Sequence, residues 1–249
     1  MVDYLETAIN AAQEAGELLR ENFGSGALKV DQLLAHDIKL ELDVRSQNLI
    51  TKLILDRHPD HAIYGEEGIA GNQQSAMQWV VDPIDGTVNY FYGIPHFCIS
   101  IALREREEII LGVILDPMRR ELWSVRKGEP PLLNGKPCAV SSRAKLSDAI
   151  LSVGFSKTKT TIDTGLPLFE QMVYRARKCR LMGSAALDMA YIACGRLDAY
   201  IEQSVSLWDI AAGIILVESA GGRVQTKTRA EMPNKFSVCA TNGALDLSV

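Results

Sequence analysis

The residues best able to do chemistry lie in one short stretch, positions 79–87, which reads WVVDPIDGT. Its apolar start is typical of a buried strand, and that strand delivers Asp82 and Asp85 into a turn stiffened by a proline. Carboxylate oxygens are hard ligands that suit Mg²⁺ better than zinc or copper. Gly86 and Thr87 then begin a short helix, whose free backbone N–H groups can hold a phosphate. The stretch therefore predicts a metal site next to a phosphate site.

Further acidic residues stand elsewhere in the chain beside apolar segments: Asp37, Asp43, Glu66, Glu67 and Asp209. Each acidic position could be purely structural, since Asp-Pro and Asp-Gly are common in turns and an acid at the start of a helix can be its N-cap. Taken together the acids favour a site, because the apolar segments would bring all of them to one edge of a sheet.

The composition argues against several classes of protein. Among 249 residues, Lys and Arg number 26 and Asp and Glu number 31, so the net charge of −5 lacks the basic footprint of a nucleic-acid binder. No apolar run approaches the roughly 18 residues of a membrane-spanning helix, and acidic Asp3 and Glu6 stand where a signal peptide is basic and then apolar. The five cysteines form no CxxC pair and the four histidines no HExxH spacing, which excludes common zinc sites. We expect a cytoplasmic protein without nucleic-acid or membrane partners.

Hydrophobic periodicity predicts the elements that must position the acidic residues. The first helix should lie between Asp3, its cap, and Gly24, its stop. Further helices are expected at about 44–57, 166–177, 184–194 and 209–219, and strands at 62–64, 79–81, 97–103, 109–115, 121–125, 150–155, 179–182, 197–201 and 236–241. Helices, then a meandering antiparallel sheet, then alternating strands and helices indicate stacked α and β layers, with a seam near 145–165.

Two motifs resemble those of a known family, the lithium-sensitive, magnesium-dependent inositol monophosphatases. Its first signature, D-P-x-D-G-T, stands at 82–87, and its second, W-D-x-x-[AG]-[AG], stands at 208–213 as WDIAAG. The five fixed residues of the first signature would occur by chance in roughly one chain in ten thousand. Glu66 and Glu67 match the acidic pair that precedes the first signature in the family. Order and spacing agree from about residue 3 to 241, so the resemblance covers nearly the whole chain.

The resemblance implies the α/β (α+β) fold of inositol monophosphatases and fructose-1,6-bisphosphatases, a layered αβαβα sandwich. We expect one domain over 1–249 with two halves, the N-terminal helices and antiparallel sheet of about 1–145 and the alternating elements of about 146–249. The metal site should lie at a sheet edge between the halves. The resemblance also implies a homodimer.

The resemblance assigns site residues position by position. Two or three Mg²⁺ ions would be held by Glu66, Asp82, the main-chain carbonyl of Ile84, Asp85 and Asp209, with Asp82 shared between two ions and Glu66 also at a weaker third. The catalytic residues would be Thr87 and Asp43, which orient and deprotonate the attacking water, together with Glu66. Gly86 and Thr87 would bind the phosphate, and the alcohol part of the substrate would contact Asp85, Ser184, Ala185 and Glu202.

The implied activity is Mg²⁺-dependent hydrolysis of a phosphate monoester, with inositol monophosphate as the expected substrate. Relatives on this scaffold hydrolyse histidinol phosphate, fructose bisphosphate, 3′-phosphoadenosine phosphates or NADP, and the fold does not choose among them. Glu202 disfavours a second phosphate, because like charges in one pocket repel. A different class of function, a metal- or phosphate-binding regulator without turnover, is disfavoured because all the expected acids are present.

The sequence departs from the family pattern at two places. Gln32 stands where many members have a lysine, and Lys29 is a possible substitute for it. The stretch 127–131, KGEPP, replaces a more glycine-rich turn, where we expect only a changed hairpin.

Overall fold

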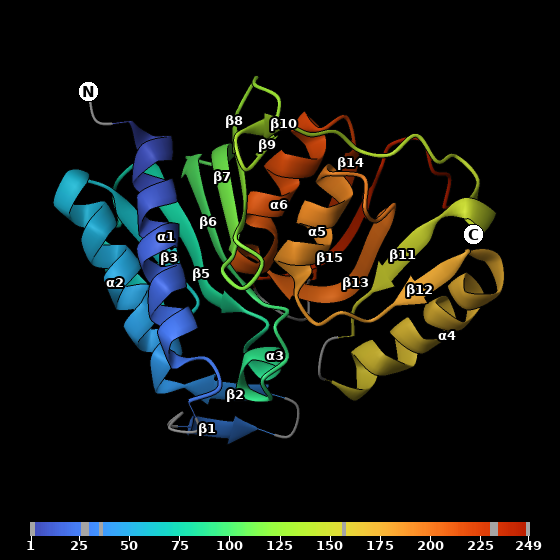
Figure 1. The fold of residues 1–249 in the computed structure, drawn as a ribbon, viewed down its shortest axis with the longest axis horizontal. Coiled ribbons are helices and arrows are strands. Elements are labelled where there is room, and N and C mark those ends of the chain that lie inside the picture. Colours follow the sequence, from blue (N-terminus) through green and yellow to red (C-terminus); the bar gives the residue numbers. More distant parts are fainter. Residues whose placement is uncertain (1–2, 26–29, 35–36, 156–157, 230–233, 248–249) are drawn as a thin grey trace.

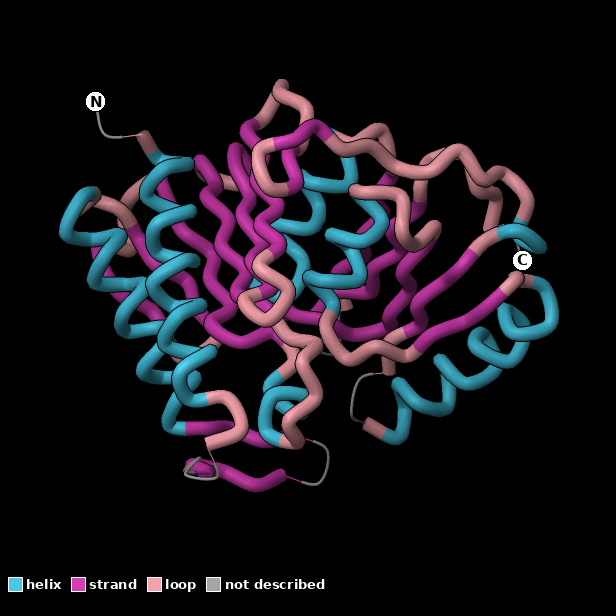
Figure 2. Tube along the Cα trace, viewed as in Figure 1, coloured by secondary structure: helices cyan, strands magenta, loops and turns pink. Residues whose placement is uncertain are grey.

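The computed structural model of the chain describes residues 3–25, 30–34, 37–155, 158–229 and 234–247, and it leaves out the side chains of 31–34 and 37. Two large sheets alternate with layers of helices, so that the order through the molecule is helix, sheet, helix, sheet, helix (Figure 1; Figure 2). This αβαβα sandwich confirms the fold class expected from the sequence. No helix of the described residues is long and apolar enough to cross a membrane.

The described helices are α1 (Tyr4–Asn22), α2 (Glu41–Arg57), α3 (Thr87–Phe91), α4 (Lys159–Arg175), α5 (Ala185–Ala193) and α6 (Leu207–Ser219), with a 3-10 turn at Leu146–Asp148. A small antiparallel pair is formed by β1 (Val30–Leu34) and β2 (Asp37–Leu40).

The first large sheet contains β3 (Ala62–Gly65), β4 (Gly68–Gly71), β5 (Met77–Asp85), β6 (Cys98–Glu105), β7 (Glu108–Asp116), β8 (Glu121–Arg126), β9 (Leu132–Leu133) and β10 (Lys136–Pro137). Its strand order is β10-β9-β8-β7-β6-β5-β3-β4, and only β3 and β5 pair in parallel. The second sheet contains β11 (Ile150–Val153), β12 (Lys178–Arg180), β13 (Ala199–Ser206), β14 (Arg223–Thr228) and β15 (Lys235–Thr241), in the order β12-β11-β13-β15-β14.

The N-terminal helices α1 and α2 cover one face of the first sheet (Figure 1). The predicted cap of α1 is confirmed, because a carboxylate oxygen of Asp3 accepts a hydrogen bond from the Leu5 N–H at 2.9 Å. A row of fully buried small side chains lets α1 lie close to α2 and the sheet: Ala8, Ala11, Ala12 and Ala15. The helix α2 begins at Glu41, earlier than the predicted start near 44, and this places Asp43 in its first turn.

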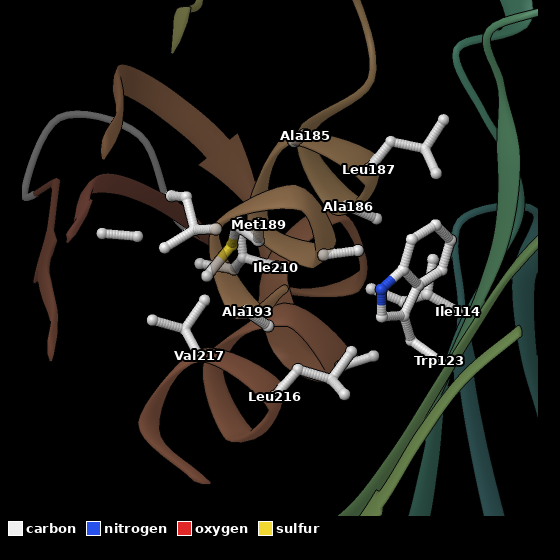
Figure 3. Close-up of a cluster of buried hydrophobic side chains, with 14 of the residues drawn as sticks. Ile114, Trp123, Ala185, Ala186, Leu187, Met189, Ala193, Ile210, Leu216 and Val217 are labelled. Carbon is white, nitrogen blue, oxygen red and sulfur yellow. The ribbon is translucent and has the colours of Figure 1, made fainter. Parts of the chain in front are cut away.

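The middle layer consists of α5 and α6, which pack against both sheets (Figure 1). Figure 3 shows Ile114 and Trp123 of the first sheet facing the buried side chains of these helices, among them Leu187 and Ile210. Glycine is required where α6 crosses β7, because a Cβ atom at Gly112 would lie 2.9 Å from the carbonyl oxygen of Ala212. This close contact holds the middle of α6 against β7, and the first turn of the same helix carries the predicted site residue Asp209.

The structure corrects several predicted boundaries. β13 continues through Glu202 to Ser206 instead of ending at residue 201, because it pairs with β15 across an irregularity between Glu202 and Val205. α4 begins at Lys159, well before the predicted start at 166, because the Thr158 side chain caps it. The predicted elements do not include β1, β2, β4, β9, β10 and β14, which are short or polar.

One buried carboxylate ties the segment between the two sheets to the second sheet. Asp198 is fully buried and accepts hydrogen bonds from the Ser141 hydroxyl, from Nε of Arg143 at 2.9 Å and from the Ile150 N–H at 2.7 Å. The Asn242 amide adds a longer contact of 3.3 Å. Loss of this carboxylate would leave several partly buried donors without this partner, each at a cost in free energy.

Asp198→Ala is therefore expected to lower the free energy of unfolding by about 2–3 kcal/mol, because the donors around this buried carboxylate lose their partner while the Arg143 side chain remains 38% exposed to water. Asp148→Ala is the matched control, because Asp148 also pairs with an arginine, Arg177 at 2.8 Å, but both side chains are about half exposed or more. We expect the control to change the free energy by no more than about 1 kcal/mol. Urea unfolding of both variants tests this, and equal losses would contradict it.

Candidate active site

A pocket of about 500 Å³ opens where β5, α3, α5, α6 and β13 meet. Six carboxylate side chains line it: Glu66, Asp82, Asp85, Asp188, Glu202 and Asp209. Among the described lining residues, Lys235 is the one lysine or arginine. The remaining predicted site residues that line the pocket are Ile84, Gly86, Thr87, Ser184 and Ala185. Of the predicted set, only Asp43 lies outside the lining, one contact away behind Thr87.

The two acids of the first motif lie at an irregular end of β5. The strand continues past its predicted end to Asp85, and its pairing with β6 shifts between Asp82 and Asp85. One oxygen of Asp82 accepts a hydrogen bond from the Ile84 N–H at 3.0 Å. One oxygen of Asp85 accepts from the Ser184 hydroxyl at 2.6 Å and from the Ala186 N–H at 2.7 Å. Asp85 therefore joins the first sheet to the start of α5.

The second motif places Asp209 in the first turn of α6. The N-cap is Ser206, and an oxygen of Asp209 accepts from the Ser206 N–H at 2.6 Å. The capping role that the sequence left open for Asp209 therefore belongs to Ser206, with Asp209 assisting from the third helical position. The same carboxylate lines the pocket, so its structural role and a metal-binding role are compatible.

Burial and mutual repulsion disfavour ionisation of these acids. Burial first, and then the charges of Asp209, Asp43 and Glu67, raise the pKa of Glu66 to about 8. Burial and Asp209 raise the pKa of Asp85 to about 7, and burial with Glu66 and Asp85 raises the pKa of Asp82 well above its usual range. Such a set of buried oxygen donors would be stabilised in its ionised form by hard divalent cations such as Mg²⁺.

The carboxylates are spread around the lining of the pocket. Among the parts of the chain that the structure describes, no three His, Cys, Asp or Glu side chains converge tightly enough to form a ready metal-ligand group. The backbone and hydroxyl hydrogen bonds described above hold individual oxygens of Asp82, Asp85 and Asp209. Carboxylate oxygens are donors that fit magnesium. The assignment of individual residues as its ligands stays a prediction.

Thr87 and Asp43 lie next to each other behind the metal-ligand candidates. The Thr87 hydroxyl donates to the Ile84 carbonyl at 2.9 Å and lies 3.4 Å from an oxygen of Asp43. The other oxygen of Asp43 accepts from the Leu40 N–H at 2.7 Å. Burial raises the pKa of Asp43 to about 7. A hydroxyl beside a carboxylate of near-neutral pKa is an arrangement suited to moving a proton.

The turn between β5 and α3 requires a glycine. Gly86 has a φ of +100°, and a Cβ atom there would lie 3.1 Å from the His96 carbonyl oxygen and 3.2 Å from that of Gly183. The Asn89 side chain, which also lines the pocket, donates to the His96 carbonyl at 2.8 Å and to the Met182 carbonyl at 2.9 Å. These contacts hold the predicted phosphate-binding turn against the loop that leads into α5.

The predicted alcohol-binding residues come from α5 and β13. Ser184 is the N-cap of α5, as predicted, and its hydroxyl contacts both Asp85 and the Leu187 N–H. Glu202 accepts a hydrogen bond of 2.6 Å from the Tyr200 hydroxyl. Sequence reasoning missed Tyr200, Asp188 and Lys235, whose places at the pocket depend on strand register and helix packing rather than on a motif. The side chain of Gln32 and all of Lys29 lie outside the described residues.

Known proteins resemble this chain in sequence and in overall fold. Residues 1–246 match the model of the inositol monophosphatase family. A Xylella fastidiosa protein named Nus factor SuhB is 39% identical over 228 residues, which cover 90% of this chain and 82% of that protein. Inositol monophosphatase 3 of Solanum lycopersicum is 34% identical and covers 97% of this chain and 93% of its own. The crystal structure of the extragenic suppressor protein SuhB from Bartonella henselae superposes with a TM-score of 0.89 at 31% identity, covering 96% of this chain and 93% of that one.

Because the native acids hold protons that the unfolded chain has already released, the metal-free protein should lose stability as pH rises. The slope is about 1.4 kcal/mol per pH unit for each such proton. The raised pKa values of about 7 for Asp43 and Asp85 and about 8 for Glu66 place the loss between pH 5 and 8. Mg²⁺ should offset the repulsion, so its stabilising effect should be larger at pH 8 than at pH 5.

Thermal unfolding in EDTA and in MgCl₂ at both pH values measures this linkage. Asp82→Asn removes one of the repelling charges, so it should raise metal-free stability at pH 8 and reduce the gain from Mg²⁺. A gain from Mg²⁺ that is the same at pH 5 and pH 8 would argue against a metal site built from these acids.

Proposed function

The chain belongs to the inositol monophosphatase family, and on that premise we propose that it is a Mg²⁺-dependent phosphatase that hydrolyses a phosphate monoester, with inositol monophosphate as the expected substrate. The observation that carries the proposal is the pocket itself, in which six carboxylates and one lysine lie beside the Thr87–Asp43 pair. Uncatalysed hydrolysis of phosphate monoesters is among the slowest of reactions, and a cluster of metal-binding carboxylates suits it.

Magnesium would be held by the residues that the family resemblance assigns: Glu66, Asp82, the Ile84 carbonyl, Asp85 and Asp209. The burial and raised pKa values of Glu66, Asp82 and Asp85 support this assignment. Bound ions would stabilise the charge on the phosphate and make water a better nucleophile. Occupation of one of these positions by lithium would inhibit the enzyme, and we include this sensitivity in the proposal.

The chain's own proton-moving groups are Thr87 and Asp43. We assign them the task of orienting the attacking water and accepting its proton, with Asp43 as the final acceptor. The near-neutral pKa of Asp43 supports this role, because a general base works best when its pKa lies near the working pH. The hydroxyl of Thr87 lies within reach of Asp43, and the Gly86–Thr87 turn would hold the phosphate.

A regulator without turnover is the second candidate function, because several relatives at 36–39% identity carry the name Nus factor SuhB. The presence of the whole acidic set and of the Thr87–Asp43 pair favours the enzyme. Phosphate release from inositol 1-phosphate with Mg²⁺ separates the two candidates directly. The proposal also includes a cytoplasmic homodimer, as expected from the family, and sedimentation of the purified protein tests the dimer.

Asp82→Asn should abolish phosphate release at saturating Mg²⁺, because Asp82 is the ligand assigned to two ions and loss of a charged ligand weakens a divalent site. Circular dichroism should show an intact fold. Asp56→Asn is the control, because it removes the same charge from an exposed position on α2. Near wild-type turnover of Asp82→Asn would refute the assignment of Asp82 to two metals.

Thr87→Val keeps the size and branching of the side chain and removes its hydroxyl. General-base contributions are typically about 10²–10⁴-fold, so kcat should fall by that order while stabilisation by Mg²⁺ changes little. Thr164→Val, on the exposed face of α4, serves as the control. An unchanged kcat in steady-state assays would mean that Thr87 takes no part in moving the proton.

A further inference from the structure

The charges of the pocket divide into two groups by their position and partners. Four acids are assigned to metals, which leaves Glu202, Asp188 and Lys235 along the part of the pocket formed by α5 and the second sheet. Burial raises the pKa of Asp188 well above its usual range, and its carboxyl accepts from the Ser152 hydroxyl at 2.6 Å. The neutral acid is thereby favoured at Asp188, so the charge of this wall depends on Glu202 and Lys235.

Glu202 is held in one place from two sides. The Tyr200 hydroxyl donates to one of its carboxylate oxygens at 2.6 Å, and Tyr200 is 1% exposed. On the other side the carboxylate lies against the bare backbone of Gly154, where a Cβ atom would come within 1.8 Å of the same oxygen. Glycine at 154 therefore makes room for this carboxylate, and a fixed acceptor results.

Lys235 is also positioned rather than free. It begins β15 in register with Ser206 of β13, and its ammonium donates to the Ser206 hydroxyl at 2.6 Å. Glu202 lies on the same strand pair, four positions before Ser206 and opposite Val238. Burial raises the pKa of Glu202 to about 7, while the hydrogen bond from Tyr200 and the positive charge of Lys235 act to lower it, so Glu202 is mainly ionised above pH 7. One acceptor and one donor of opposite charge therefore belong to the same wall of the pocket.

We propose that Lys235 determines specificity: together with Glu202 it forms a charge-balanced wall that selects esters whose alcohol part is neutral and rich in hydroxyl groups. This inference rests on the proposed phosphatase function and names its substrate class. A polyol can donate to the carboxylate of Glu202 and accept from the ammonium of Lys235. A charged alcohol part is attracted by one of these two groups and repelled by the other. It therefore binds no more tightly than a neutral one.

The test measures kcat/KM at pH 8, where Glu202 is mainly ionised, for three esters that differ in the charge of the alcohol part: inositol 1-phosphate, phosphoethanolamine and fructose 1,6-bisphosphate. Each value is divided by that of the wild-type protein, which removes differences in size among the esters. Lys235→Met should lower the ratio for the bisphosphate by about tenfold, the usual effect of losing one charge-assisted hydrogen bond. The same variant should raise the ratio for phosphoethanolamine, and Glu202→Gln should shift both ratios in the opposite direction.

Lys227→Met is the matched control, because it removes the same charge from an exposed position on the neighbouring strand β14. Lys235→Arg should retain the wild-type order of esters. An equal loss for all three esters in Lys235→Met would overturn the proposal and leave Lys235 only the task of supporting Ser206 and α6.

If the wild-type protein releases phosphate from none of the esters, the proposed function fails. In that case the affinities of the same esters for the wild-type protein, Lys235→Met and Glu202→Gln are measured by calorimetry. If the effect of each variant does not depend on the charge of the ester, the proposal is refuted.

Discussion

Six carboxylates that face one pocket repel one another, and the surrounding structure has to hold them there against that repulsion. Three of them, Asp82, Asp85 and Asp209, share one feature with Asp43, which lies just behind the pocket. One oxygen of each accepts a hydrogen bond from a backbone N–H. For Asp43, Asp85 and Asp209 this donor lies at the start of a helix, and for Asp82 it lies at the irregular end of β5. Such charge-assisted bonds are stronger than neutral ones and fix the direction of each side chain. The fold therefore supplies partners for part of each of these carboxylates, and bound cations would compensate the rest.

The backbone donors can do this only if the helix ends are themselves immobile, and the middle layer provides that. The buried faces of α5 and α6 are crowded with small and aliphatic side chains, and glycines allow backbone contact at the crossing points. At Gly213 of α6 a Cβ atom would lie 2.7 Å from Met189 of α5. Interiors packed at this density transmit small shifts, so changes far from the pocket can move its acids.

Local sequence signals were sufficient for much of this arrangement. The apolar run before Asp82, the capping residues Asp3 and Ser184, and the layered order of elements all follow from short-range patterns, and the structure agrees with them. What could not be predicted depends on partners distant in the chain. Glu202 lies inside β13 because β15 pairs with it, and Lys235 lies at the pocket because its ammonium bonds Ser206, 29 residues earlier. Polar edge strands such as β14 carry no apolar alternation from which to predict them.

The packing of α6 on β7 has a consequence for the lifetime of the folded protein. These elements stand far apart in the chain, at 207–219 and 108–116, and contacts between such distant segments tend to form late in folding. The pocket is complete only after they meet, so an ion that needs the complete pocket contributes little to the folding transition state. Such an ion slows unfolding more than it speeds folding. The occupancy of the pocket would then set how long a native molecule persists, separately from how quickly it is made.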